Sequence, residues 1–168
     1  KLDGKVAFIT GAANGIGRTT ALLFADKERL SSSPISMKKT GEKRSLKNKA
    51  WRTRRFFRLD VTEEEQWRDV VERTVQRFGT IDILFNNAGI FLIKPITETS
   101  VEEWNDVMNV NVTGTFLGMK HVLPIMAKNR RGSIINSSSV AGLKGAPGRA
   151  LYGASKGAVR IMTKDVAI

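Results

Sequence analysis

Apolar residues in this chain gather in short runs between polar turns, and four of the runs have the length and composition of β-strands. Residues 5–10, 56–59, 81–85 and 133–136 are rich in β-branched, aromatic and other apolar side chains. The first run stops at Gly11 and the third stops at Asn86. The pattern therefore predicts four short strands, each followed by a polar turn.

Between these runs, apolar residues recur at helical spacing. This spacing covers residues 16–25, 63–78, 101–128 and the chain from 151 onward. Ser100 is the expected N-cap of the third helix, and Pro124 is a candidate for a kink late in it. Strands that alternate with helices predict one α/β domain over residues 1–168: a doubly wound parallel sheet in a three-layer α/β/α arrangement.

Residues 27–54 interrupt the alternation where a second strand and helix are expected. Ser31-Ser32-Ser33-Pro34 is followed by a Lys- and Arg-rich stretch without apolar periodicity, which is typical of a disordered basic insert. An alternative hypothesis concerns the gene. With suitable synonymous codons, residues 31–41 read in a shifted frame as Val-Val-Ala-Asp-Ile-Asn-Glu-Glu-Asp-Gly, a buried strand that ends in aspartate. Sequencing the coding DNA decides between the two, because codons incompatible with the shifted frame exclude it.

The net charge of +12 raises the question of nucleic-acid binding. Residues 27–58 hold 12 of the 28 Lys and Arg residues but 2 of the 16 Asp and Glu residues, so the rest of the chain is close to neutral. A nucleic-acid interface also needs aromatic side chains among its charges, and only Trp51, Phe56 and Phe57 lie nearby. We therefore expect no nucleic-acid partner.

The amino-acid composition excludes two kinds of catalytic chemistry. The chain has no cysteine and a single histidine, His121, so no thiolate chemistry and no catalytic metal are expected. His121 lies within a predicted helix, where a packed or surface role is expected. No apolar run approaches the roughly 18 residues of a membrane span, and no signal-peptide pattern opens the chain. The expected location is the cytoplasm, without a membrane partner.

Two turns at predicted strand ends carry candidate binding residues. Thr10-Gly11-x-x-x-Gly15-Ile16-Gly17 lies between a strand and a helix. There, glycines allow a tight turn, close approach of a pyrophosphate and close helix–strand packing, and the helix N-terminus favours an anion. Asn86-Asn87-Ala88-Gly89 follows another strand, at the edge where open α/β sheets bind ligands. Ordinary glycine- or asparagine-rich turns are the alternative for both motifs.

Candidate catalytic residues follow near the end of the chain. Tyr152 and Lys156 are four residues apart in a predicted helix, so they share one face. A phenol has an ordinary pKa of about 10 and is a poor base at neutral pH, but a neighbouring ammonium stabilises the phenolate. A solvated helix face is the alternative for this pair. Ser137-Ser138-Ser139 follows the strand at 133–136; it is either a serine-rich loop or a source of hydroxyls for a substrate oxygen, with nothing to suggest a Ser-His-Asp triad.

The ordered set of these motifs, together with Asp60-Val61 and Asn109-Val110-Asn111-Val112-x-Gly114, resembles the short-chain dehydrogenase/reductase family. The resemblance covers residues 2–25 and 56–168. It implies a Rossmann-type fold and an NAD(P)-dependent oxidoreductase that transfers a hydride between a nicotinamide cofactor and a secondary alcohol or ketone. It also implies a homotetramer or dimer.

The resemblance assigns roles by position. Tyr152 is the implied general acid/base and Ser139 the residue that orients the reacting oxygen, with Ser138 as second choice. Lys156 is implied to activate the tyrosine and hold the nicotinamide ribose, and Asn111 to support a proton-relay water. The implied cofactor-binding residues are Gly11, Asn14, Gly15, Ile16, Gly17, Asp60, Val61, Asn87, Ala88, Gly89, Tyr152 and Lys156.

Two departures from the family pattern affect these expectations. Residues 27–54 replace the strand whose terminal acidic residue favours NAD, or whose basic surroundings favour NADP. In the shifted frame the lost residue is an aspartate and the parent enzyme prefers NAD, whereas the basic run as it stands indicates NADP; the expectation is NAD. The chain also stops at Ile168, where family members continue with further strands and a substrate-covering loop. We therefore expect an incomplete domain that lacks the C-terminal strands, and a catalytically inactive nucleotide-binding fragment is the alternative function.

Overall fold

The computed structural model describes residues 2, 4–26 and 55–167, and its centre is a parallel three-stranded sheet. The strands β1 (Ala7–Ile9), β2 (Ile83–Asn86) and β3 (Ser133–Asn136) lie in the order β1-β2-β3. Ala7 is paired with Ile83, and Ile83 with Ser133. Since all three strands run in the same direction, their carboxyl ends meet at one edge, where the candidate site lies.

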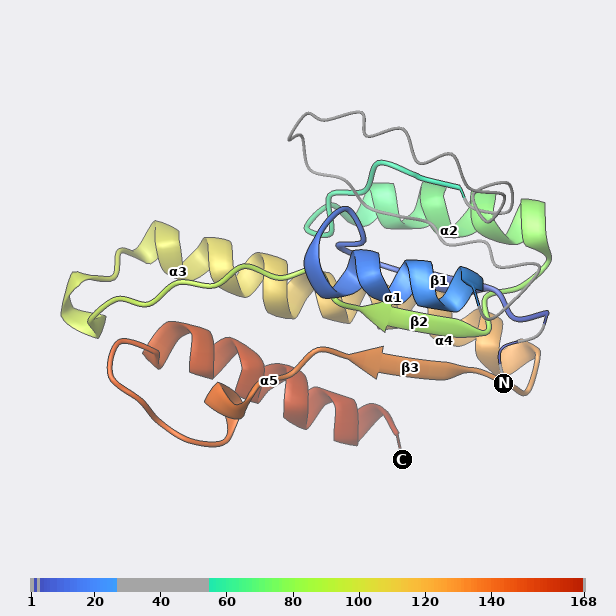
Figure 1. The fold of residues 1–168 in the computed structure, drawn as a ribbon. Coiled ribbons are helices and arrows are strands. Elements are labelled where there is room, and N and C mark those ends of the chain that lie inside the picture. Colours follow the sequence, from blue (N-terminus) through green and yellow to red (C-terminus); the bar gives the residue numbers. More distant parts are fainter. Residues whose placement is uncertain (1, 3, 27–54, 168) are drawn as a thin grey trace.

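Helices cover both faces of this sheet. The α-helices of the described residues are α1 (Gly15–Asp26), α2 (Glu64–Phe78), α3 (Val101–Met108), α4 (Gly114–Lys128) and α5 (Ala150–Val166). Ile9 and Phe85 pack with Ala21 of α1 on one face. Phe8 and Leu84 belong to the larger core cluster with α2 and α4 on the other face. This alternation along β1 and β2 is the two-residue period of a sheet buried on both sides, and it confirms the predicted α/β/α layers (Figure 1).

The helix predicted at residues 101–128 is interrupted. Ser100 caps α3 as expected: its side chain accepts the Glu103 N–H, and the Glu103 carboxylate accepts the Ser100 N–H. Between α3 and α4 the chain makes a π-helical turn, η3 (Asn109–Thr113), whereas Pro124 lies inside α4. In Figure 1, α3 and the start of α5 extend beyond the carboxyl ends of the strands. Asn111 of the π-helical turn bonds to Ile90 and to Ser155 of α5, and such turns are frequent at functional sites.

The strand predicted at residues 56–59 is wrong for the part of the chain that the structure describes, because the sheet consists of β1, β2 and β3. Leu59 and Val61 are nevertheless buried in the cluster that contains Trp67 and Leu117. A short apolar run indicates burial, and here burial is achieved by packing against helices rather than by strand pairing. The expectations for residues 27–54 lie outside the described residues.

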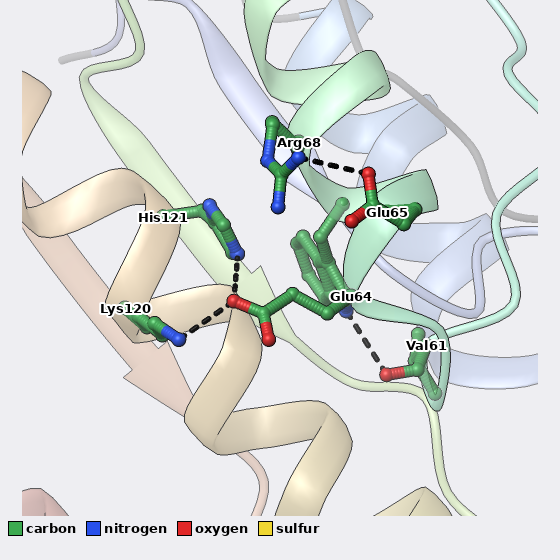
Figure 2. Close-up of polar contacts among 7 residues, drawn as sticks. Val61, Glu64, Glu65, Arg68, Lys120 and His121 are labelled. Carbon is green, nitrogen blue, oxygen red and sulfur yellow. Dashed lines mark hydrogen bonds and ion pairs between the residues drawn. The ribbon is translucent and has the colours of Figure 1, made fainter.

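The start of α2 is fastened to α4 (Figure 2). Glu64 Oε1 lies 2.6 Å from Lys120 Nζ and 3.2 Å from His121 Nε2, and the hydrogen bond from Lys120 is the main cause that lowers the pKa of Glu64. His121 thus has the packing role expected of it. The buried Trp67 donates its indole N–H to the Val61 carbonyl over 3.0 Å. These bonds fix the segment that carries Asp60 and Val61.

Among the described helices, none has the length and apolar character needed to cross a bilayer.

Asp82 joins the three strands at their amino ends, and we predict a large loss of stability when its carboxylate is removed. The residue is 4% exposed; Oδ2 accepts the Val6 N–H over 3.0 Å, and Oδ1 lies 2.9 Å from Arg131 Nε. Asp82→Ala leaves a buried N–H without its acceptor, so the free energy of unfolding should fall by about 2–3 kcal/mol in denaturant titration. Asp69→Ala, which breaks an exposed pair with Arg73, should cost at most about 0.5 kcal/mol. Equal effects of the two changes would contradict this role.

Candidate active site

The turn between β1 and α1 is closed by glycines that admit no side chain. Gly11 has a φ of +65°, and a Cβ there would lie 2.9 Å from Ala88 Cα. A Cβ on Gly17 would lie 2.7 Å from the Gly11 carbonyl oxygen and 2.5 Å from Asn87 Nδ2. The first turn of α1 therefore packs directly on the polar turn that follows β2.

The other side of the same turn is open. Gly15 has a φ of +53°, and an added Cβ would meet nothing within 4 Å. Asn14 is exposed, and the Ile16 side chain is 73% exposed, which is unusual for an isoleucine at the start of a helix. The first turn of α1 contains no acidic residue. Space, a helix N-terminus and an apolar side chain beside it fit a phosphate-bearing, partly apolar ligand.

Thr10 connects the two candidate binding turns, although it was not among the predicted cofactor-binding residues. Its Oγ1 accepts the N–H groups of Asn87 and Ala88, both over 3.0 Å. Asn87 returns a bond from Nδ2 to the Thr10 carbonyl over 3.1 Å. The sequence feature that could have indicated this role is a hydroxyl residue at the end of a buried strand. Thr10 is only 2% exposed, so its hydroxyl needs a hydrogen-bond partner there.

Asp60 and Val61 have structural roles in the turn before α2. Asp60 Oδ1 accepts the N–H and hydroxyl of Thr62 over 3.1 and 2.8 Å. Val61 is 7% exposed, and a Cβ on Gly114 would lie 2.8 Å from its Cγ2. The predicted adenine contact of this pair stays a prediction.

Lys156, Tyr152, Asn111 and Gly89 meet at the carboxyl edge of the sheet. The Lys156 side chain donates from Nζ to the Ser137 carbonyl over 2.7 Å, and Nζ lies 5.7 Å from the centroid of the Tyr152 ring. A Cβ on Gly89 would lie 3.1 Å from Asn111 Oδ1 and 3.5 Å from Lys156 Nζ. Lys156 is 5% exposed, and this burial lowers its pKa. The ammonium of Lys156 is thus held beside the phenol in a largely dry environment.

The serine run lies against α5. Ser139 Oγ accepts the Ala141 N–H over 3.1 Å and starts the short helix η4 (Val140–Gly142). Ser138 Oγ instead donates to the Lys156 carbonyl over 2.9 Å. A Cβ on Gly142 would lie 2.7 Å from the backbone nitrogen of Gly157, and one on Gly153 would lie 2.8 Å from the Ala141 carbonyl oxygen. Gly142 of η4 and Gly153 of α5 therefore let η4 approach the helix that carries Tyr152 and Lys156; neither glycine was among the predicted site residues.

An exposed aromatic ring contacts the phenol. The Phe91 ring packs edge-on against Tyr152, with 4.5 Å between ring centroids, and Phe91 is 56% exposed. Elsewhere, Ile93 in the segment before α3 and Val140 and Leu143 in the segment before α5 are also more than half exposed. An exposed aromatic ring beside a phenol suits an uncharged organic substrate.

Comparison with known proteins finds similar sequences over nearly the whole chain. A family profile described as short chain dehydrogenase matches residues 5–168. The 3-oxoacyl-[acyl-carrier-protein] reductase FabG of Thermotoga maritima is 43% identical, over 98% of this chain and 67% of its own length. The cyclopentanol dehydrogenase of a Comamonas species is 39% identical, over 100% of this chain and 68% of its own length.

Solved structures have the same fold. A crystal structure of NAD+-bound xylitol dehydrogenase aligns with a TM-score of 0.86 at 34% identity and covers 99% of this chain and 65% of that protein. A structure of ElxO with NADP bound aligns with a TM-score of 0.85 at 36% identity and covers 97% and 66%, respectively. The chain thus spans about two thirds of the length of these proteins.

Proposed function

The chain belongs to the short chain dehydrogenase family, and from this premise we propose that it is an NAD(P)-dependent oxidoreductase acting on a secondary alcohol or ketone. The observation that supports this most strongly is the meeting of the Tyr152 phenol and the buried Lys156 ammonium beside the turn at Gly89. That arrangement pairs an acid/base group with a charge that stabilises its ionised form.

The two glycine-lined turns fit a dinucleotide. At Gly11 and Gly17 the chain packs too closely to admit side chains. Gly15 faces open space, with the exposed residues Asn14 and Ile16 beside it. In our proposal the pyrophosphate lies on this turn and Asn87, Ala88 and Gly89 line the adjoining part of the cleft. Asp60 and Val61 would contact the adenine. When bound, the nicotinamide supplies the hydride donor or acceptor.

Side chains of the protein would transfer the proton. Tyr152 gives a proton to the substrate oxygen in reduction and removes it in oxidation, and Ser139 holds that oxygen by a hydrogen bond. Lys156 stabilises the phenolate and holds the nicotinamide ribose. Asn111 supports the proton-relay water through its place in the π-helical turn. The exposed side chains of Phe91 and Leu143 would contact the apolar part of the substrate.

We propose NAD rather than NADP as the cofactor, on the shifted-frame aspartate alone. The segment that would carry the discriminating residue lies outside the described residues. The two solved relatives bind NAD+ in one case and NADP in the other, so likeness to them does not separate the cofactors.

A homotetramer or dimer is also proposed. Trp104 of α3, Phe116 of α4 and Ile161 of α5 are 39%, 46% and 53% exposed, and burying such side chains in a subunit interface would be favourable.

The second candidate function is a nucleotide-binding protein without turnover, for which the glycine-lined turns alone would suffice. The two functions are separated by titrating the chain with NADH and NADPH, followed by cofactor fluorescence, and by assaying turnover of cyclic and linear secondary alcohols. We expect binding and turnover, with tighter binding of NADH. Binding without turnover would select the second function, and failure to bind either cofactor would refute both.

A further inference from the structure

Ser155 is a fully buried hydroxyl between Tyr152 and Lys156. It is 0% exposed. Its Oγ donates to the Tyr152 carbonyl over 2.8 Å and accepts from Asn111 Nδ2 over 3.0 Å. One hydroxyl thus joins the first turns of α5 to the π-helical turn η3, 44 residues away in the sequence.

The Asn111 amide has no donor left for another partner. Its Oδ1 accepts the Ile90 N–H over 2.8 Å, and its Nδ2 donates both to the Ile90 carbonyl over 3.0 Å and to Ser155. An amide nitrogen carries two donor hydrogens, and both are used. Asn111 therefore ties the loop after Gly89 to the helix that carries Tyr152.

The first turn of α5 has no side-chain cap of its own. Its N-cap residue, Arg149, makes no side-chain capping bond, so the first turn relies on contacts with neighbouring elements. A serine that bonds to a carbonyl of its own helix contributes little to helix stability, and alanine is the better helix former. The hydroxyl of Ser155 is therefore best explained by its bond to Asn111.

We propose that Ser155 is a positioning residue, which sets the Tyr152 phenol beside the Lys156 ammonium by anchoring the Tyr152 carbonyl to Asn111. The inference rests on the proposed function for its catalytic meaning. Without the anchor, the first turn of α5 would shift and the phenol would move away from the ammonium, which weakens the attraction that stabilises the phenolate.

The test compares Ser155→Ala with Thr163→Val. Thr163 has the same bonds two turns further along α5: it donates to the Val159 carbonyl over 2.6 Å and accepts from Asn136 Nδ2 over 3.0 Å. Both changes remove a hydroxyl that links α5 to an asparagine, but only Ser155 lies beside Tyr152. Similar losses in melting temperature, of a few degrees, are expected for both.

Tyr152 is the only tyrosine, so the NMR resonances of a selectively labelled tyrosine ring report this one side chain without cofactor or turnover. We expect these resonances to shift in Ser155→Ala, because the ring moves relative to the Phe91 ring that it contacts, and to stay at the wild-type positions in Thr163→Val. Where turnover is measurable, kcat should fall about tenfold in Ser155→Ala with little change in the cofactor KM.

Unchanged tyrosine resonances in Ser155→Ala, or an equal shift of them in Thr163→Val, would overturn the inference. If Ser155→Ala does not fold, Ser155→Cys provides the test, because a thiol is a weaker hydrogen-bonding group; a smaller shift of the resonances is then expected, and no shift overturns the inference. Since this readout needs no nucleotide, failure of the inference is distinguishable from failure of the proposed function, which appears as absent cofactor binding.

Discussion

Tyr152→Phe is expected to reduce turnover of a secondary alcohol by about 10³-fold while cofactor affinity changes by less than about threefold. Phenylalanine keeps the ring and hence the edge-on contact with Phe91, so only the hydroxyl that carries the proton is lost. Steady-state kinetics give the loss of kcat, and a fluorescence titration gives the cofactor Kd.

His121→Gln provides the control for this prediction. His121 is the only histidine and is bonded to Glu64 in the α2–α4 contact (Figure 2), away from the residues that surround Tyr152. Its replacement should leave kcat within about twofold, as for a residue outside the reaction. Activity retained in Tyr152→Phe would refute the acid/base role, and an equal loss in His121→Gln would attribute the effect to stability.

Gly17→Ala is expected to weaken cofactor binding by about 100-fold or more. The added methyl would lie 2.7 Å from the Gly11 carbonyl oxygen, which is backbone and cannot rotate away. The start of α1 must therefore separate from the Gly11 turn, and the amides that would hold the pyrophosphate separate with it. Isothermal titration with NADH and NADPH measures the loss.

Gly79→Ala is the matched control. Gly79 has a φ of +78° at the end of α2, with nothing within 4 Å of an added Cβ. The change should cost about 1 kcal/mol of stability through backbone strain but leave cofactor binding unchanged. Near wild-type binding in Gly17→Ala would show that the turn does not hold the cofactor.

Local sequence patterns were enough to predict most of the secondary structure. The alternation of apolar residues and the helical spacing predicted the three strands of the described sheet and the helix faces, because burial on a sheet or a helix leaves a fixed period. The glycine, asparagine and serine motifs fall directly after these strands. Parallel strands bring such turns to one edge, so the candidate site followed from chain order.

Only the tertiary structure decided which of those residues bond to one another. Asn111 and Ser155 are 44 residues apart, and Thr10 and Asn87 are 77 apart; no periodicity encodes such pairs. The run at 56–59 is apolar because it is buried, but strand pairing requires a neighbour that a local pattern cannot supply. The π-helical turn at 109–113 likewise interrupts a regular helical pattern. Residue types therefore indicated a candidate chemistry, whereas the geometry of the candidate site depends on packing between distant segments.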